Sequence, residues 1–169
     1  MRETSADLEG LQALLDRSSE RASSFLRTAF RMPEHSLSAA QLCAHLEGAL
    51  QIAFATVTAR GEPRVAPINA FFLRAVFYVP TVAEATRARH LARRPGASLT
   101  YYEGEHLAVI GHGRATQVGQ SDPEFAELDA TQVECGQQSP LEWSGTGVYL
   151  RFEPDVLYTF ALEPGNYPG

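Results

Sequence analysis

The segment from Thr81 to Pro95 carries four arginines and one glutamate, although the chain has a formal net charge of -6. It follows an apolar run typical of a β-strand, and its spacing predicts a helix over 82–93 that Pro95 closes. Free N–H groups at a helix N-terminus, the Thr81 hydroxyl and a nearby guanidinium would together suit a phosphate group. The segment therefore indicates a site for a phosphorylated ligand.

The same segment also permits a purely structural interpretation. Thr81 and Glu84 have the spacing of a capping box, which would fix the start of the helix. The arginines would then only solvate its outer face, and Glu84 would place a negative charge near any phosphate. The residues alone leave both interpretations open.

Composition limits the class of protein. The chain has 169 residues, of which 44% are hydrophobic and 20% are charged, as in a single compact domain. An acidic chain is not a general nucleic-acid binder, because phosphate backbones are bound mainly by clustered basic residues. Cys43 and Cys135 have no CxxC neighbour, so neither a disulfide framework nor a metal site is expected. With no signal peptide or membrane span indicated, we expect a cytoplasmic protein.

Hydrophobic periodicity predicts helices around a set of short strands. The expected helices cover 5–17, 25–30, a segment that starts at the capping box of Ser38 and Gln41, 82–93, and 123–133. The expected strands cover 52–58, 64–71, 76–79, 97–102, 106–118 and 148–160, the last bent at Pro154. A serine-rich break is expected over 17–24 and a loop over 134–147. Tight turns between the strands favour a closed antiparallel barrel, so the class is mainly β (α+β).

The order of these elements gives a specific resemblance. The chain has a hairpin, a third strand that ends at Thr81, the sequence Thr86-Arg87-x-x-His90-Leu91, and then a strand that begins with proline. In this order of elements the chain resembles the pyridoxamine 5'-phosphate oxidase-like FMN-binding split-barrel family. The resemblance covers about residues 38–160. It implies a six-stranded antiparallel split β-barrel domain over 38–169, with residues 1–37 as an N-terminal helical extension.

The resemblance also implies a set of cofactor-binding residues. Thr81 matches the hydroxyl at the end of the strand, Arg87 matches the lysine that holds the FMN phosphate, and Thr86 matches the arginine before it. Arg64 and Asn69 lie where the family lines the isoalloxazine ring. His106 matches a residue that contacts the flavin from the other subunit, so the resemblance implies a homodimer. No catalytic side chain is assigned.

The expected function is that of an FMN-dependent oxidoreductase whose substrate is not specified, reduced by a nicotinamide or a small organic molecule. The chain lacks the C-terminal Arg-x-His motif of the enzyme that oxidises pyridoxamine phosphate, so vitamin B6 oxidation is not expected. A second hypothesis replaces FMN with a deazaflavin, whose extra negative charge Arg89, Arg93 or Arg94 could meet. A third is a flavin-binding protein without catalytic activity.

Overall fold

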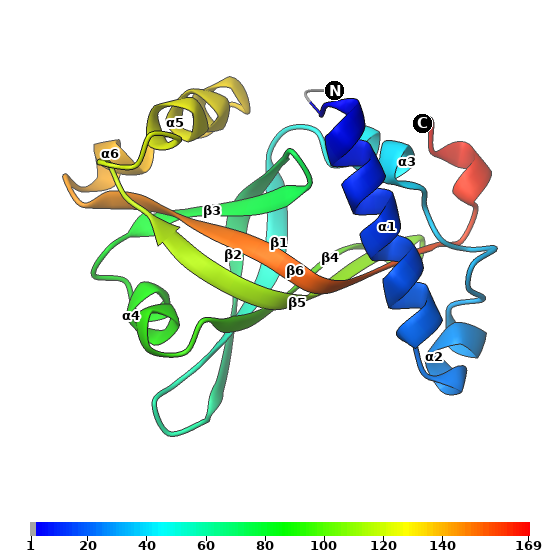
Figure 1. Cartoon of the computed structure of the whole chain (residues 1–169). Coiled ribbons are helices and arrows are strands. Elements are labelled where there is room, and N and C mark those ends of the chain that lie inside the picture. Colours follow the sequence, from blue (N-terminus) through cyan, green and yellow to red (C-terminus); the bar gives the residue numbers. More distant parts are fainter. Residues whose placement is uncertain (1–2) are drawn as a thin grey trace.

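A computed structural model describes residues 3–169, and six antiparallel strands form a closed barrel in the order β1-β2-β3-β6-β5-β4 (Figure 1). This confirms the predicted fold class. The strands are β1 (Leu50–Val57), β2 (Pro63–Leu73), β3 (Val76–Val82), β4 (Gly96–Glu103), β5 (Leu107–Val118) and β6 (Gly147–Ala161). The helices are α1 (Ser5–Arg21), α2 (Ser24–Ala29), α3 (Ala39–His45), α4 (Thr86–Arg93), α5 (Phe125–Glu134) and α6 (Pro140–Trp143), with a 3-10 turn at Pro164–Asn166. None of these helices within residues 3–169 is long and apolar enough to cross a membrane.

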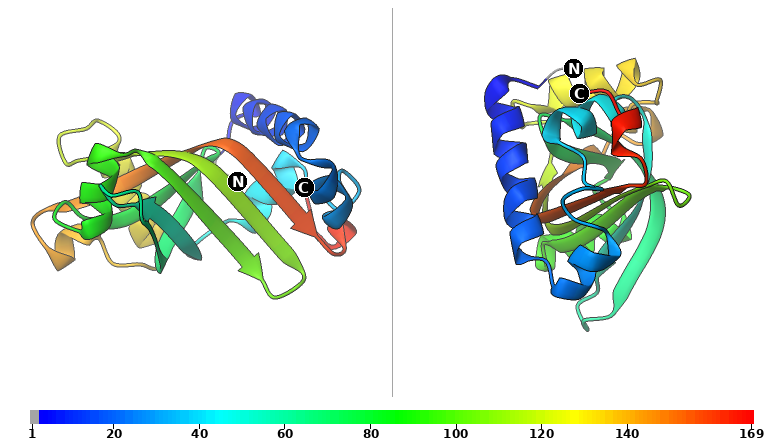
Figure 2. Two further views of the ribbon diagram at one scale, coloured as in Figure 1. Left: turned by 90° about the horizontal axis from the view of Figure 1, so that it is seen from below. Right: turned by 90° about the vertical axis from the view of Figure 1, so that its right-hand side faces the viewer.

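Alternating side chains fill the barrel. On β1, Ile52 and Phe54 are buried and their neighbours are more exposed, as expected for a strand with one face on the core. Phe54 and Phe77 both pack edge-to-face on Phe152 of β6, with ring centroids 6.1 and 6.4 Å apart. The long β1–β2 hairpin extends beyond this core, so the first half of β2 is largely exposed (Figures 1 and 2).

A bulge at Asp155 in β6 lies beside Pro154, where this strand was expected to bend. The register shifts between His112 and Gly113, and Gly113 then pairs with Pro154. A Cβ atom on Gly113 would lie 2.1 Å from the Glu153 carbonyl oxygen, so only glycine fits. The bulge lets β6 continue as one strand through Pro154.

Helix α1 continues through the serine-rich stretch, so the break predicted there from residue 17 is wrong. The Ser18 hydroxyl donates to the Leu14 carbonyl (2.7 Å) and accepts a hydrogen bond from the Leu157 N–H of β6 (3.0 Å). These contacts hold the last turns of α1 against the barrel (Figure 2). The capping box of Ser38 and Gln41 at the start of α3 is confirmed.

The predicted start of the helix after β3 is also wrong. Strand β3 continues through Thr81 and Val82, because these residues pair with Val148 and Gly147 of β6. Helix α4 therefore begins at Thr86, and Thr81 and Glu84 form no capping box. The predicted loop over 134–147 contains the short helix α6, which Ser139 caps by accepting a hydrogen bond from the Leu141 N–H.

Candidate phosphate-binding site

The Arg87 guanidinium meets the Thr81 hydroxyl at the end of β3. Arg87 Nη1 donates to Thr81 Oγ1 at 3.1 Å, and Thr81 is almost completely buried. Arg87 is half-buried, and this burial lowers the pKa of its guanidinium. Within residues 3–169 no carboxylate forms an ion pair with it. A partly desolvated cation without a counter-charge is costly, so this arrangement favours an external anion.

The N-terminus of α4 lies beside this pair. Ala85 is its N-cap residue, and no side chain caps the helix. The first N–H groups of a helix have no partners within the helix and carry partial positive charge. Arg87 lies within this first turn. A phosphate held there could accept hydrogen bonds from the backbone and from the guanidinium together.

An open pocket of about 470 Å³ surrounds these groups. Asn69 of β2, Thr81 and Arg87 supply its polar side chains. The rest of its lining consists of Ile68, Pro80, Val82, Ala85 and Trp143. The pocket therefore joins one cationic, hydrogen-bonding region to a larger apolar wall.

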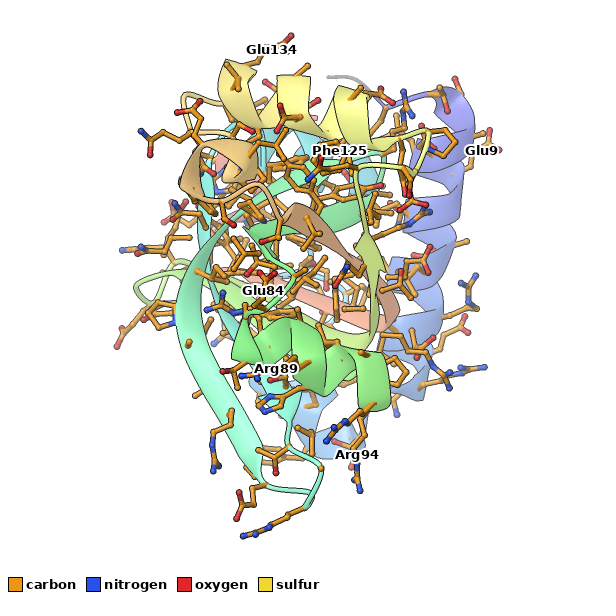
Figure 3. All side chains as sticks on the ribbon, turned by 90° about the vertical axis from the view of Figure 1, so that its left-hand side faces the viewer. Glu9, Glu84, Arg89, Arg94, Phe125 and Glu134 are labelled. Carbon is orange, nitrogen blue, oxygen red and sulfur yellow. The ribbon has the colours of Figure 1, made fainter. Side chains whose placement is uncertain are left out.

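Glu84 lies outside the lining of this pocket. Its carboxylate is fully exposed and accepts a hydrogen bond from the Thr146 hydroxyl at 2.6 Å, which lowers the pKa of Glu84. Figure 3 shows Glu84 just before α4, with Arg89 and Arg94 further along the helix. The carboxylate of Glu84 is thus hydrogen-bonded to Thr146 and is not one of the groups that line the pocket.

The structure brings together three of the six predicted cofactor-binding residues in one chain, namely Asn69, Thr81 and Arg87. Thr86 is the first residue of α4, but its hydroxyl is exposed and accepts a long hydrogen bond from Arg89 (3.5 Å). Only the backbone N–H of Thr86, in the first turn of α4, is placed to donate a hydrogen bond to a phosphate at the helix N-terminus.

Arg64 and His106 lie away from this pocket. Arg64 is on the extending hairpin, paired with Glu62 at 2.8 Å, and five residues, or about 16 Å of strand, separate it from Asn69. His106 is in the exposed β4–β5 turn. It lies just before the start of β5, whereas Val118, at the other end of β5 and about 40 Å along the strand, pairs with Tyr149, the residue after the partner of Thr81 on β6. Neither residue lines the pocket around Arg87 within one chain.

Sequence reasoning missed the apolar wall of the pocket. Ile68 precedes the predicted Asn69 on β2, but successive side chains of a strand point to opposite faces, so adjacency alone did not predict that both line one pocket. Trp143 comes from α6, more than fifty residues after Arg87 in the sequence. No local pattern in the sequence places Trp143 beside Arg87.

A second group of arginines lies on the outer side of α4. Arg89, Arg93 and Arg94 are all exposed, and Arg94 donates to the Ala59 carbonyl at 2.9 Å. Among residues 3–169, none of the three forms an ion pair with a carboxylate. This surface is positive on a chain that is acidic overall.

Comparison with known proteins agrees with this fold. A family model described as Pyridoxamine 5'-phosphate oxidase matches residues 40–159, which is well over half of the chain. The chain therefore belongs to this family. The matched region includes the whole candidate site. No curated protein sequence matches the chain.

Solved structures show the same fold at low sequence identity. A conserved hypothetical protein from Mycobacterium tuberculosis is 16% identical with a TM-score of 0.66, and the match covers 81% of this chain and 92% of that one. An F420 reductase is 17% identical with a TM-score of 0.54, over 66% of this chain and 91% of that one. An FMN-binding protein from Nostoc punctiforme, related to pyridoxamine 5'-phosphate oxidase, is 17% identical with a TM-score of 0.51. This match covers 67% of this chain and 74% of that one.

Proposed function

We propose that this protein is an FMN-dependent oxidoreductase, with the FMN phosphate held by Arg87, Thr81 and the N-terminus of α4. The observation that carries the proposal is the half-buried Arg87, which lacks a carboxylate partner among residues 3–169 and lies beside an uncapped helix N-terminus. Bound FMN would supply the electron-transfer chemistry, while the protein binds and orients it. A nicotinamide or a small organic molecule would be the reductant.

The polar groups of the pocket are suited to binding. Asn69, Thr81 and Arg87 can hydrogen-bond a ligand, but none of them is an acid or base that exchanges a proton near neutral pH. We therefore assign no catalytic side chain. The alternative is that the protein binds flavin without turning it over. Reduction of the bound flavin by NADH or NADPH, followed by reoxidation, would distinguish an oxidoreductase from a binding protein.

FMN titration of the purified protein tests the proposal. Flavin fluorescence should change with saturation in the wild type, and Arg87→Ala should bind much more weakly. Arg27→Ala is a matched control, because it also removes one positive charge but from the exposed surface of α2. Absence of FMN binding by the wild type, or equal loss in both variants, would contradict the proposal.

A deazaflavin such as F420 is the second candidate cofactor. Arg89, Arg93 and Arg94 favour it, because three exposed cations on α4 could meet additional negative charge on the ligand. An F420 reductase is among the proteins of similar fold. Parallel titrations with FMN and F420 separate the two candidates. Replacing the three arginines by glutamine should weaken F420 binding much more than FMN binding.

We further propose a cytoplasmic homodimer in which Arg64, Thr86 and His106 complete the cofactor site, with His106 contributed by the partner. Exposed apolar side chains on the strands support this, since Val65 is 70% and Tyr102 63% exposed. Cys43 and Cys135 lie far apart in the sequence and neither has a CxxC neighbour, which agrees with a reducing compartment. Mass measurement in solution tests the dimer, and a strict monomer would exclude a role for His106 at the site.

A further inference from the structure

Trp143 is the single tryptophan of the chain, and it lines the same pocket as Thr81 and Arg87. Its side chain is 47% exposed. It takes part in none of the aromatic ring pairs found within residues 3–169. A large aromatic ring that faces a pocket and stacks on no other ring is available to a ligand.

The chain holds Trp143 in place through the short helix α6. Ser139 caps this helix and donates to the Asp129 carboxylate at 2.6 Å, which ties α6 to α5. At the other end of the segment, a Cβ atom on Gly147 would lie 2.6 Å from the Pro140 carbonyl carbon. Glycine is required there for α6 to pack against the start of β6.

A second contact fastens this segment to the entrance of α4. The Thr146 hydroxyl donates to the Glu84 carboxylate at 2.6 Å, and the Ala83 N–H donates to the Thr146 carbonyl at 3.0 Å. The connection from β3 to α4 and the connection from α6 to β6 are therefore joined directly. Trp143 lies in α6, next to the connection that leads to β6, and Arg87 lies in α4, next to the connection that comes from β3. These contacts join the segment that carries the indole ring to the segment that carries the guanidinium.

The lining of the pocket indicates what kind of ligand would use both residues. A free phosphate ion would need only the polar region around Arg87. The apolar wall of Ile68, Pro80, Val82, Ala85 and Trp143 would gain from a carbon body attached to the phosphate. A phosphate ester with an organic body thus fits better than inorganic phosphate.

We propose that Trp143 is a binding and specificity residue, whose indole packs on the organic part of the ligand next to the phosphate held by Arg87. The proposal rests on the proposed function and adds a residue that discriminates an organic phosphate from inorganic phosphate. Glu84 and Thr146 are positioning residues, because they act through the segment that carries Trp143.

Titration of the full-length protein with FMN tests the proposal. Trp143→Ala should weaken FMN binding by about fivefold to tenfold, as expected for loss of an aromatic stacking contact. Trp143→Phe, which keeps a ring, should recover most of the affinity. Inorganic phosphate, measured by its competition with FMN, should bind Trp143→Ala and wild type alike, since it needs only the polar region. Phe25→Ala, which removes an 80% exposed ring from α2, should leave FMN binding unchanged.

Chemical modification gives a readout of contact. Because Trp143 is the single tryptophan, its oxidation by N-bromosuccinimide can be followed in one peptide by mass spectrometry. Saturating FMN should slow this oxidation, whereas inorganic phosphate should not. Thr146→Val should weaken FMN binding and Thr146→Ser should restore it, because serine keeps the hydroxyl that contacts Glu84.

The outcomes separate this inference from the proposed function. FMN affinity of Trp143→Ala within twofold of the wild type, with Arg87→Ala still impaired, would overturn the role of Trp143 alone. Equal weakening of FMN and inorganic phosphate would likewise overturn it, because the variant would then have disturbed the polar region. A wild type that binds no FMN would overturn both proposals.

Discussion

Replacing Arg87 by alanine should separate ligand binding from folding. In the free protein the substitution removes the hydrogen bond to Thr81, worth about 1 kcal/mol, and it also removes a partly desolvated charge. These two effects oppose each other. We therefore expect the free energy of unfolding without ligand to change by less than about 1 kcal/mol.

The effect on the complex should be much larger. Hydrogen bonds to a charged group contribute about 1.5–3 kcal/mol, so losing the guanidinium should weaken FMN binding by roughly 10-fold to 150-fold. At an FMN concentration about 100 times the wild-type Kd, the ligand stabilises the wild type by about 2.7 kcal/mol. If Arg87→Ala binds about 100-fold more weakly, the same concentration stabilises it by only about 0.4 kcal/mol.

Thermal unfolding with and without FMN measures both quantities. For a domain of this size, FMN should raise the Tm of the wild type by roughly 5–10 °C and that of Arg87→Ala by about 1–2 °C. The two proteins should have nearly equal Tm without ligand. A loss of more than about 3 kcal/mol without FMN would show that Arg87 is a structural residue, and an unchanged FMN-induced shift would refute its role in binding.

Three further results are expected from the packing and the titratable groups. Gly113→Ala should lower the free energy of unfolding, measured in urea, by more than about 2 kcal/mol, because its Cβ would meet the β6 backbone. Gly10→Ala, at an open position on α1, should be neutral or stabilise the protein by up to about 1 kcal/mol. Equal effects of the two substitutions would contradict the bulge geometry. Burial raises the pKa of the Cys43 thiol from 9.0 to about 12. As pH rises, Cys43 therefore loses its proton first in the unfolded chain, so the free energy of unfolding should fall between about pH 9 and 12. Cys43→Ala should reduce this alkaline loss of stability, and an unchanged pH profile would refute the assignment. Iodoacetamide at pH 8 should leave Cys43 unmodified in the native protein and label it after unfolding, as peptide masses would show.

Much of the barrel follows from local patterns. The alternation around Ile52 and Phe54, and the capping box at Ser38, depend on residues close together in the chain, so they are visible in the sequence. The fold class and the succession of strands along the chain were predicted correctly for this reason. The closeness of Thr81 and Arg87 in space was also predictable, because they are only six positions apart in the sequence.

The errors come from contacts between distant segments. Thr81 belongs to β3 because it pairs with Val148, and nothing near Thr81 reveals that pairing. The turn of α1 at Ser18 persists because β6 supplies a hydrogen-bond donor from Leu157. In the same way, Trp143 lines one pocket with Arg87 although more than fifty residues separate them in the sequence. Such features require the folded chain.

The absorption spectrum of the purified protein, followed by titration with FMN, tests the central claim most directly. If the site around Arg87 binds a flavin phosphate, the protein should be yellow as isolated, or should acquire flavin absorption bands that stay with it through gel filtration. The bands should be lost from Arg87→Ala and retained by Arg27→Ala. A colourless protein that binds neither FMN nor F420 would contradict the account.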